Sequence, residues 1–365
     1  MSLPVVSVIV PTHNRAHFLG DALASLREQS LREIEIIVVD DGSTDGTTQL
    51  LAEFGDPRLV VVCHAVNRGI PAARNSGLER ASGRFIAWLD SDDVSRADRL
   101  EHQAAYLSNH PETAMIGCCA GKIDPAGRRI AGIRVPPFED GAIKAWLLFR
   151  PAFQQSSIMG RSEILKAFPY RPENPVCEDY DVFLRLSAAG YRLENLPRVL
   201  IDRRIHPDQT VRVSENLIPA RTGALLAPVL ARLGMTFSAE DLKRHVQLGN
   251  LQTNFVGEEF LSWANCWIAG LYAANAITAQ FDVDSLGLAT GYCWLRACKA
   301  AWPSSGKWRA AQWFFKGLTG TRFASAWTWA VSVARVVIGE SLAPARRGSR
   351  RGVEKSAKSP FPHDV

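Results

Sequence analysis

Three aspartates are grouped directly after an apolar run, in the segment Asp90-Ser91-Asp92-Asp93 that follows Phe85–Leu89. Carboxylates crowded in this way repel one another unless a hard cation binds them or water solvates them well. Mg²⁺ or Mn²⁺ typically binds one or two carboxylates together with substrate phosphates, and would offset the charge of a leaving diphosphate. An Asp-x-Asp alone is common in surface turns, but its position after a buried strand favours a metal site.

Two further polar segments also follow predicted strands. In Asp40-Asp41-Gly42-Ser43-Thr44-Asp45-Gly46, a carboxylate at the strand end can accept a hydrogen bond from a base N–H or a ribose hydroxyl. We expect Asp41 to contact the nucleotide and Thr44 or Asp45 to cap the next helix. The segment Pro11-Thr12-His13-Asn14-Arg15 precedes a helix whose N-terminus suits a nucleotide, although an ordinary loop has the same composition.

Apolar runs alternate with amphipathic segments in the first half of the chain. We expect strands at residues 5–10, 34–39, 59–63, 85–89 and 114–118, and helices at about 18–26, 44–54, 70–80 and 97–109. This alternation indicates βαβ units and a parallel sheet. Because ligands bind at the carboxyl edge of such sheets, the three polar segments should converge in one cleft.

The pattern changes after about Lys122. Residues 124–127 read as a turn between two short strands, Asp179 precedes a helix that it could cap, and residues 199–206 read as a strand. After about Glu215 the chain is mostly helical and rich in Trp. We predict a catalytic domain at 1–214, a Trp-rich helical region at 215–343 and a basic disordered tail at 344–365.

The charge of the chain is unevenly distributed. Net charge is +5, and residues 303–365 carry eleven Lys and Arg against three Asp and Glu, which leaves 5 − 8 = −3 for the rest. A near-neutral body does not fit a nucleic-acid-binding domain. A basic tail could bind anionic lipid headgroups, or it could be a disordered tail that keeps the chain in solution. The segment from Lys307 to Lys316 mixes aromatic and cationic residues. It suits a membrane interface and inward packing of its aromatic side chains equally well.

The cysteines and the N-terminus bear on the compartment. The seven cysteines form no Cys-x-x-Cys pair, so neither a disulfide framework nor a zinc site is expected, and a reducing compartment is the simpler interpretation. The apolar run from Leu3 to Val10 lacks a basic n-region, so we interpret it as a buried strand and not as a signal peptide. The expected location is the cytoplasm, with peripheral contact at the cytoplasmic face of the membrane.

Five segments together resemble the family 2 glycosyltransferases, which have the GT-A fold. They are Val8-Ile9-Val10-Pro11-Thr12-His13-Asn14-Arg15, Ile37-Val38-Val39-Asp40-Asp41-Gly42-Ser43-Thr44-Asp45, Asn67-Arg68-Gly69, Ala73-Arg74-Asn75-Ser76-Gly77 and Leu89-Asp90-Ser91-Asp92-Asp93. Their order and spacing are specific, and the resemblance covers roughly residues 4–210. It implies an α/β fold with a Rossmann-like, mostly parallel sheet flanked by helices, to which a C-terminal helical extension is added.

The resemblance implies a role for each matching residue. Thr12, Asn14 and Arg15 line the nucleotide pocket with the backbone of Pro11. In this resemblance Asp41 reads the base, a uracil, and Arg74 lies near the donor phosphates or sugar. Asp90 contacts ribose or sugar, and Asp92 is the main metal ligand. His13 stands where many relatives have Tyr, although an imidazole can still stack on a base.

The resemblance extends to two sites in the second half of the predicted catalytic domain. Asp179 matches the general base, because an inverting transfer needs a carboxylate that takes the proton from the acceptor hydroxyl. Glu178 is the neighbouring alternative, and a purely capping role for Asp179 stays open. His206 resembles a histidine that some relatives use on the metal or the diphosphate, although a lone histidine is more often structural.

These residues predict an inverting, metal-dependent hexosyltransferase that uses Mg²⁺ or Mn²⁺. It would transfer a sugar from a nucleotide-diphospho-sugar, a UDP-sugar, to a hydroxyl of a glycan or lipid-linked acceptor in cell-envelope polysaccharide assembly. Two alternatives are a catalytically inert sugar-nucleotide-binding scaffold and a nucleotidyltransferase. The second would need a Gly- and Lys-rich phosphate loop near the N-terminus, which the sequence lacks.

Overall fold

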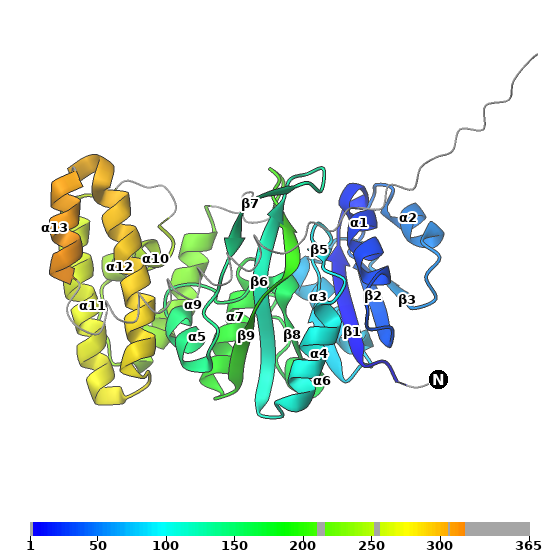
Figure 1. The fold of residues 1–365 in the computed structure, drawn as a ribbon, viewed down its shortest axis with the longest axis horizontal. Helices are drawn as coiled ribbons and strands as arrows, with labels where there is room; N and C mark the ends of the chain where they lie inside the picture. Colours follow the sequence, from blue (N-terminus) through cyan, green and yellow to red (C-terminus); the bar gives the residue numbers. More distant parts are fainter. Residues whose placement is uncertain (1–2, 210–215, 252–255, 306, 318–365) are drawn as a thin grey trace, which may run out of the picture.

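The computed structural model describes residues 3–209, 216–251, 256–305 and 307–317. Within these residues, nine strands form one sheet in the order β3-β2-β1-β4-β8-β6-β9-β5, with β7 beside β6 (Figure 1). The strands are β1 (Val6–Thr12), β2 (Ile34–Asp40), β3 (Leu59–Cys63), β4 (Phe85–Trp88), β5 (Val94–Ser95), β6 (Thr113–Ile123), β7 (Arg129–Arg134), β8 (Met159–Arg161) and β9 (Arg192–Arg204).

The first half of the sheet is the predicted βαβ unit. Strand β1 pairs in parallel with β2 and β4, and β2 pairs in parallel with β3. The connecting helices are α1 (Ala16–Arg27), α2 (Thr47–Glu53), α3 (Ile70–Arg80) and α4 (Arg99–Asn109). The predicted strand at 59–63 and the predicted helix at 70–80 have the observed bounds. The predicted α/β class, with a sheet flanked by helices, is confirmed.

The second half of the sheet mixes directions. Strand β8 pairs antiparallel with both β4 and β6, while β9 runs parallel to β6. The predicted turn at 124–127 joins β6 to β7, and its closing bond runs from Gly127 N to Asp124 O at 2.9 Å. The strand predicted at 114–118 is only part of β6. Gly121 and Lys122 weaken the apolar pattern of the sequence after residue 118, but the pairing with β9 continues the strand to Ile123.

The remaining helices fall into two groups. Helices α5 (Asp140–Leu147), α6 (Ser162–Ala167) and α7 (Glu178–Ala188), with the 3₁₀ turn η1 (Gln155–Ser157), accompany the sheet. Helices α9 (Ile218–Arg232), α10 (Ala239–Gly249), α11 (Glu258–Thr278), α12 (Val283–Ser305) and α13 (Lys307–Gly317) gather at one end of the molecule (Figure 1). C-terminal helices are therefore present up to Gly317, whereas residues 318–343 of the predicted helical region and the tail at 344–365 lie outside the described residues.

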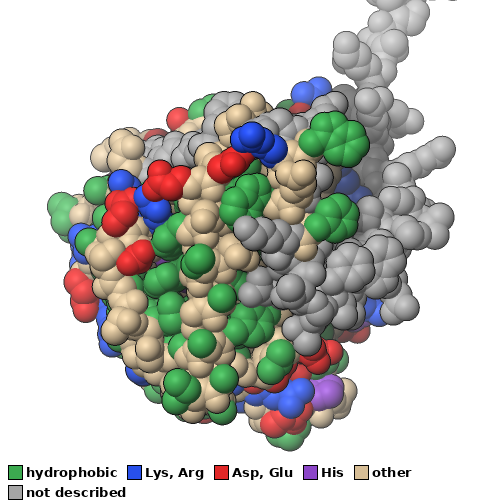
Figure 2. Space-filling model, turned by 90° about the vertical axis from the view of Figure 1, so that its left-hand side faces the viewer, with side chains coloured by type: hydrophobic (Ala, Val, Ile, Leu, Met, Phe, Trp, Pro, Cys, Tyr) green, Lys and Arg blue, Asp and Glu red, His purple; other side chains and the backbone are tan. Residues whose placement is uncertain are grey.

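The C-terminal helices share their core with the sheet. One apolar cluster runs from Ile9 in β1 to Ala301 in α12 and includes the buried Trp267 and Trp294. Large hydrophobic side chains also reach the outer surface of these helices, where Trp308 is 86% and Phe315 71% exposed. Figure 2 shows this end of the molecule, with hydrophobic side chains at the surface. No helix in the described ranges is both long and apolar enough to cross a bilayer.

Close packing between α3 and β1 places the helix that carries Arg74. A Cβ added to Gly77 would lie 2.3 Å from Cγ2 of Ile9, which is fully buried in the sheet. Only a hydrogen at this position lets the helix approach the strand so closely. Gly77 therefore fixes the distance between α3 and the carboxyl edge of the sheet.

We expect Gly77→Ala to lower the free energy of unfolding by about 1–3 kcal/mol, because an added methyl group overpacks this contact. Gly20→Ala in α1 is the matched control, since its Cβ would meet Leu50 at an ordinary 3.7 Å. The control should be neutral or more stable by up to about 1 kcal/mol, because alanine has the higher helix propensity. Urea unfolding followed by circular dichroism measures both, and equal stability of the two variants would contradict the packing argument.

Candidate active site at the carboxyl edge of the sheet

The three polar segments predicted to converge do lie at adjacent strand ends. Thr12 and Asp40 are register partners at the ends of β1 and β2, and β4 lies on the other side of β1. Asp90 follows β4 by two residues. The predicted convergence of these segments at one edge of the sheet is therefore correct.

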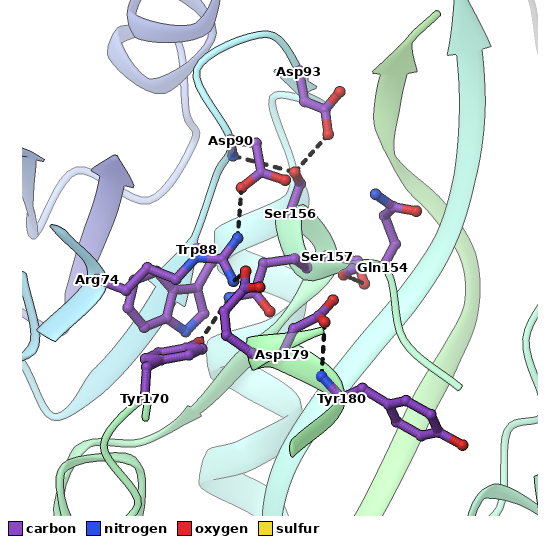
Figure 3. A network of polar contacts seen from close by, with 12 residues as sticks. Arg74, Trp88, Asp90, Asp93, Gln154, Ser156, Ser157, Tyr170, Asp179 and Tyr180 are labelled. Atoms are coloured by element: carbon purple, nitrogen blue, oxygen red, sulfur yellow. Dashed lines mark hydrogen bonds and ion pairs between the residues drawn. The ribbon is translucent and has the colours of Figure 1, made fainter. Parts of the chain in front are cut away.

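A buried guanidinium connects the acidic segment to the second half of the fold. Arg74 of α3 donates to Glu178 Oε1 at 2.6 Å and to Asp90 Oδ1 at 3.3 Å (Figure 3). Its guanidinium carbon lies 5.3 Å from the ring centre of Tyr170 and 5.9 Å from that of Trp88. Two carboxylates far apart in sequence thus share one cation, between aromatic faces that favour it.

Burial and charge compete at this cation. Burial alone would lower the pKa of Arg74, but Glu178 and Asp90 outweigh it and raise that pKa. Burial raises the pKa of Glu178 to about 7 and also raises that of Asp90, although Arg74 opposes both shifts. Removing Arg74 would therefore leave the buried Glu178 and the half-buried Asp90 without the cation that favours their ionised forms.

Glu178 and Asp179 are adjacent in sequence but have different surroundings. Cys177 before it has a left-handed backbone with φ of 67°, which a residue with a side chain rarely adopts, and α7 starts at Glu178. Glu178 is buried against Arg74, whereas Asp179 is half-buried and its Oδ1 accepts the N–H of Tyr180 at 2.7 Å. No described residue bonds Asp179 Oδ2, so this oxygen remains available for a ligand.

The acidic segment is fixed by groups that the sequence analysis did not single out. Ser156 Oγ donates to Asp93 at 2.5 Å and accepts the N–H of Asp90 at 3.2 Å (Figure 3). The fully buried Arg204 donates its backbone N–H to Asp93 and its Nε to the carbonyl of Asp92, both at 2.9 Å. Burial, reinforced by Asp92 and Asp90, raises the pKa of Asp93.

The side chains of Asp92 and His206 are in contact. Asp92 Oδ2 lies 2.8 Å from His206 Nε2, and the buried Nδ1 of His206 has no hydrogen-bond partner in the described part of the chain. No group of three or more His, Cys, Asp or Glu able to hold a metal occurs among the described residues. One carboxylate and one imidazole nevertheless fit Mg²⁺ or Mn²⁺, which take further ligands from water and substrate phosphates.

The two aspartates at the end of β2 differ in their remaining capacity to bind. Asp41 Oδ1 lies 2.6 Å from His64 Nδ1 and accepts the N–H of Arg68, and its Oδ2 accepts the N–H of Gly69 at 2.8 Å. Both oxygens of Asp41, the residue expected to read the base, are thus engaged by the loop before α3. Asp40 binds Ser43 N through Oδ1, and no described residue bonds its Oδ2.

The loop after β1 is held mainly by its own polar groups. Asn14 has a φ of 51°, and its Oδ1 accepts the N–H of Thr44 at 2.8 Å. Arg15 donates to the carbonyl of Asp208 at 2.7 Å, and Pro11 belongs to β1. The hydroxyl of Thr12 and Nδ1 of His13 are both buried without a hydrogen-bond partner among the described residues. The cap predicted at Thr44 or Asp45 is wrong, because α2 begins at Thr47 with Gly46 at its N-cap; Asp45 lies one residue earlier and accepts the N–H of Thr47 at 3.0 Å.

The chain is similar to known glycosyltransferases. Residues 7–168 match the family described as Glycosyl transferase family 2. The putative glycosyltransferase EpsE of Bacillus subtilis is 31% identical over 217 residues, which are 58% of this chain and 77% of that relative. The UDP-Glc:alpha-D-GlcNAc-diphosphoundecaprenol beta-1,3-glucosyltransferase WfgD of Escherichia coli is 37% identical over 113 residues, 31% of this chain but only 45% of that protein.

A solved structure has the same fold. The crystal structure of S. aureus TarS in complex with UDP-GlcNAc superposes with a TM-score of 0.51 and 20% sequence identity. The match covers 81% of this chain and 89% of that one. At this level of identity the similarity concerns the fold alone.

The contacts of Asp41 predict a structural role that stability measurements can test. We expect Asp41→Asn to lower the free energy of unfolding by about 1.5–3 kcal/mol, because an amide NH₂ would face one of the donors that the carboxylate now accepts. Asp98→Asn is the control, since this side chain is 44% exposed and its ion pair with His102 at 3.5 Å contributes little. Urea unfolding at neutral pH measures both, and an unchanged midpoint for Asp41→Asn would contradict the role.

Proposed function

Since the chain belongs to glycosyl transferase family 2, we propose that it is an inverting enzyme that transfers a sugar from a UDP-sugar to an acceptor hydroxyl. The observation that carries the proposal is the bridge by which Arg74 holds Asp90 and Glu178 together beside the free oxygen of Asp179. This bridge unites the acidic segment with a half-buried carboxylate that suits a general base. An inert scaffold would have no need for such an arrangement.

The donor would lie across the ends of β1, β2 and β4. Thr12 has a hydroxyl without a protein partner, and Asp40 has a carboxylate oxygen that could accept the N3–H of uracil. We assign the base contact to Asp40 in place of Asp41, because the loop before α3 already occupies both oxygens of Asp41. Asn14, Arg15 and Pro11 would then act by shaping this pocket.

Asp92 and His206 are the residues that would hold Mg²⁺ or Mn²⁺. Such an ion, when bound, neutralises charge on the leaving diphosphate. Arg74 would also help to neutralise the charge of the diphosphate. Its guanidinium lies beside Asp90, which would contact the ribose or the sugar. Asp93 holds the segment in place through Ser156 and Arg204 and has no oxygen to spare for a ligand among its described contacts.

Asp179 would remove the proton from the acceptor hydroxyl. Its Oδ2 is free, and the bond from Tyr180 N to Oδ1 fixes the direction of the carboxylate. Glu178 would position Arg74 and would not exchange protons with substrate, because it is buried in the ion pair. The similarity to WfgD supports a glycan or lipid-linked acceptor in envelope polysaccharide assembly.

The proposal predicts different defects for two substitutions. We expect Asp92→Ala and Asp179→Asn each to abolish transfer, but only Asp92→Ala to weaken metal-dependent binding of UDP. Loss of a general base reduces turnover by about 10²–10⁴-fold. A screen of nucleotide-sugars for metal-dependent hydrolysis identifies the donor first, and calorimetry then measures UDP binding with and without Mn²⁺.

The control for this pair is Glu163→Gln, an exposed acid in the first turn of α6, as Asp179 is in the first turn of α7. It should leave turnover and UDP binding unchanged. Full turnover by Asp179→Asn would remove that residue from the mechanism, and unchanged metal-dependent UDP binding by Asp92→Ala would remove that carboxylate from the metal site. A wild type that binds no UDP in the presence of metal would favour the inert scaffold.

We further propose peripheral membrane contact through α13. Trp308 and Phe315 are both strongly exposed and lie seven residues apart, on the same face of this helix. Arg309 ties α13 to α11 through Glu258 at 2.9 Å. Such an aromatic pair between basic residues suits the interface of an anionic bilayer.

We expect the double variant Trp308→Ser, Phe315→Ser to lose most of its binding to vesicles of phosphatidylserine and phosphatidylcholine, because two aromatic anchors are removed. Cosedimentation measures bound protein. The control is Ile277→Ser at the end of α11, which removes an equally exposed apolar side chain. Equal binding by the double variant and the wild type would exclude α13 as the attachment site.

A further inference from the structure

Three arginines on the Asp179 side of the site lack an acidic partner. Arg134 ends β7, Arg150 follows α5, and Arg203 lies in β9, and none of them makes an ion pair with a described residue. The other two cations of the site are both compensated, since Arg74 pairs with Glu178 and Arg204 with Asp21. The three arginines are thus an uncompensated positive cluster.

Neutral groups hold two of these arginines in place. Arg134 donates to Gln154 Oε1 at 2.9 Å and to the carbonyls of Pro151 and Phe153 at 3.1 Å. Arg150 donates to Tyr292 Oη at 3.3 Å, and Arg203 is half-buried without a hydrogen bond to any described residue. Hydrogen bonds to neutral acceptors fix a guanidinium in place but do not offset its positive charge.

The arginines are close enough to act on one another. Burial, together with the charges of Arg150 and Arg203, lowers the pKa of Arg134 to about 10, while Asp179 opposes the shift. The pairings Ala120↔Arg134 and Lys122↔Arg203 place two of them on either side of β6. Three guanidinium groups against the carboxylate of Asp179 give 3 − 1 = +2 at neutral pH, which an anionic ligand would offset.

The cluster lies away from the donor side of Asp179. Figure 3 shows Arg74 on one side of Asp179 and Gln154, the anchor of Arg134, on the other. Tyr292 comes from α12, so the C-terminal helices supply part of this side of the site. An acceptor that approaches Asp179 from here meets the positive cluster before it meets the base.

We propose that Arg134, Arg150 and Arg203 bind an anionic group of the acceptor, a phosphate or a carboxylate, and thereby bring the acceptor hydroxyl to Asp179. Arginine suits both anions, because its planar fork binds two oxygens at once. The inference rests on the proposed function, since it takes Asp179 as the base. It adds a substrate class, an acidic acceptor, and it gives the C-terminal helices a part in acceptor binding.

Binding of two small anions tests the inference. The protein is first saturated with UDP and Mg²⁺, so that the donor side is filled, and is then titrated in a calorimeter with methyl phosphate, methyl glucuronide or the neutral methyl glucoside. We expect saturable binding of at least one anion and none of the glucoside. Arg203→Gln and Arg150→Gln should each weaken it about tenfold, as expected for the loss of one charge-assisted contact.

The variants separate charge from structure. Arg203→Lys keeps the charge and should restore most of the affinity, whereas Arg128→Gln, an 80% exposed arginine in the β6–β7 hairpin, should bind like wild type. Preference for methyl phosphate indicates a phosphorylated acceptor, and preference for methyl glucuronide a uronic acid. Absence of saturable anion binding, or binding that Arg203→Gln and Arg150→Gln leave unchanged, overturns the inference. Metal-dependent UDP binding is measured on the same samples, so a failure of the donor site is recognised separately.

Discussion

The site depends on one buried cation that two carboxylates share. Arg74 is nearly inaccessible to solvent and bonds both Asp90 and Glu178, which come from opposite halves of the fold. Removing one partner of a buried ion pair typically costs about 3–5 kcal/mol, because the other charge is left uncompensated. The close packing of Gly77 on Ile9 therefore matters for chemistry, since it sets where α3 presents this guanidinium.

Adjacent acidic residues take different roles because their surroundings differ. Asp41 is saturated by the loop before α3, whereas Asp40 keeps an oxygen free. Glu178 is engaged in the ion pair with Arg74, whereas Asp179 is half-buried and one of its oxygens has no hydrogen bond to a described residue. In each pair one carboxylate holds the structure, and its neighbour remains available to a ligand. Two adjacent acidic residues are thus not redundant.

The two ends of the site differ in sign. The donor side carries Asp90, Asp92 and Asp93, whose charge a divalent ion and Arg74 would offset. The opposite side carries arginines that only neutral groups anchor, among them Arg134 on Gln154. The proposed anionic acceptor would be attracted to the arginines, whereas a diphosphate would need the divalent ion to offset the carboxylates on the proposed donor side.

The sequence by itself determined the strands and helices of the first half and the carboxylates after them, because period and turn residues are local signals. It also identified Asp92 and His206, which lie 114 residues apart yet meet at 2.8 Å. It did not reveal that Arg204 and Ser156 hold the acidic segment, or that Asp41 is fully engaged. Hydrogen bonds between segments that are distant in the sequence produce no periodic pattern in it. Only the tertiary structure therefore decided which carboxylates are engaged by other residues and which remain available to a ligand.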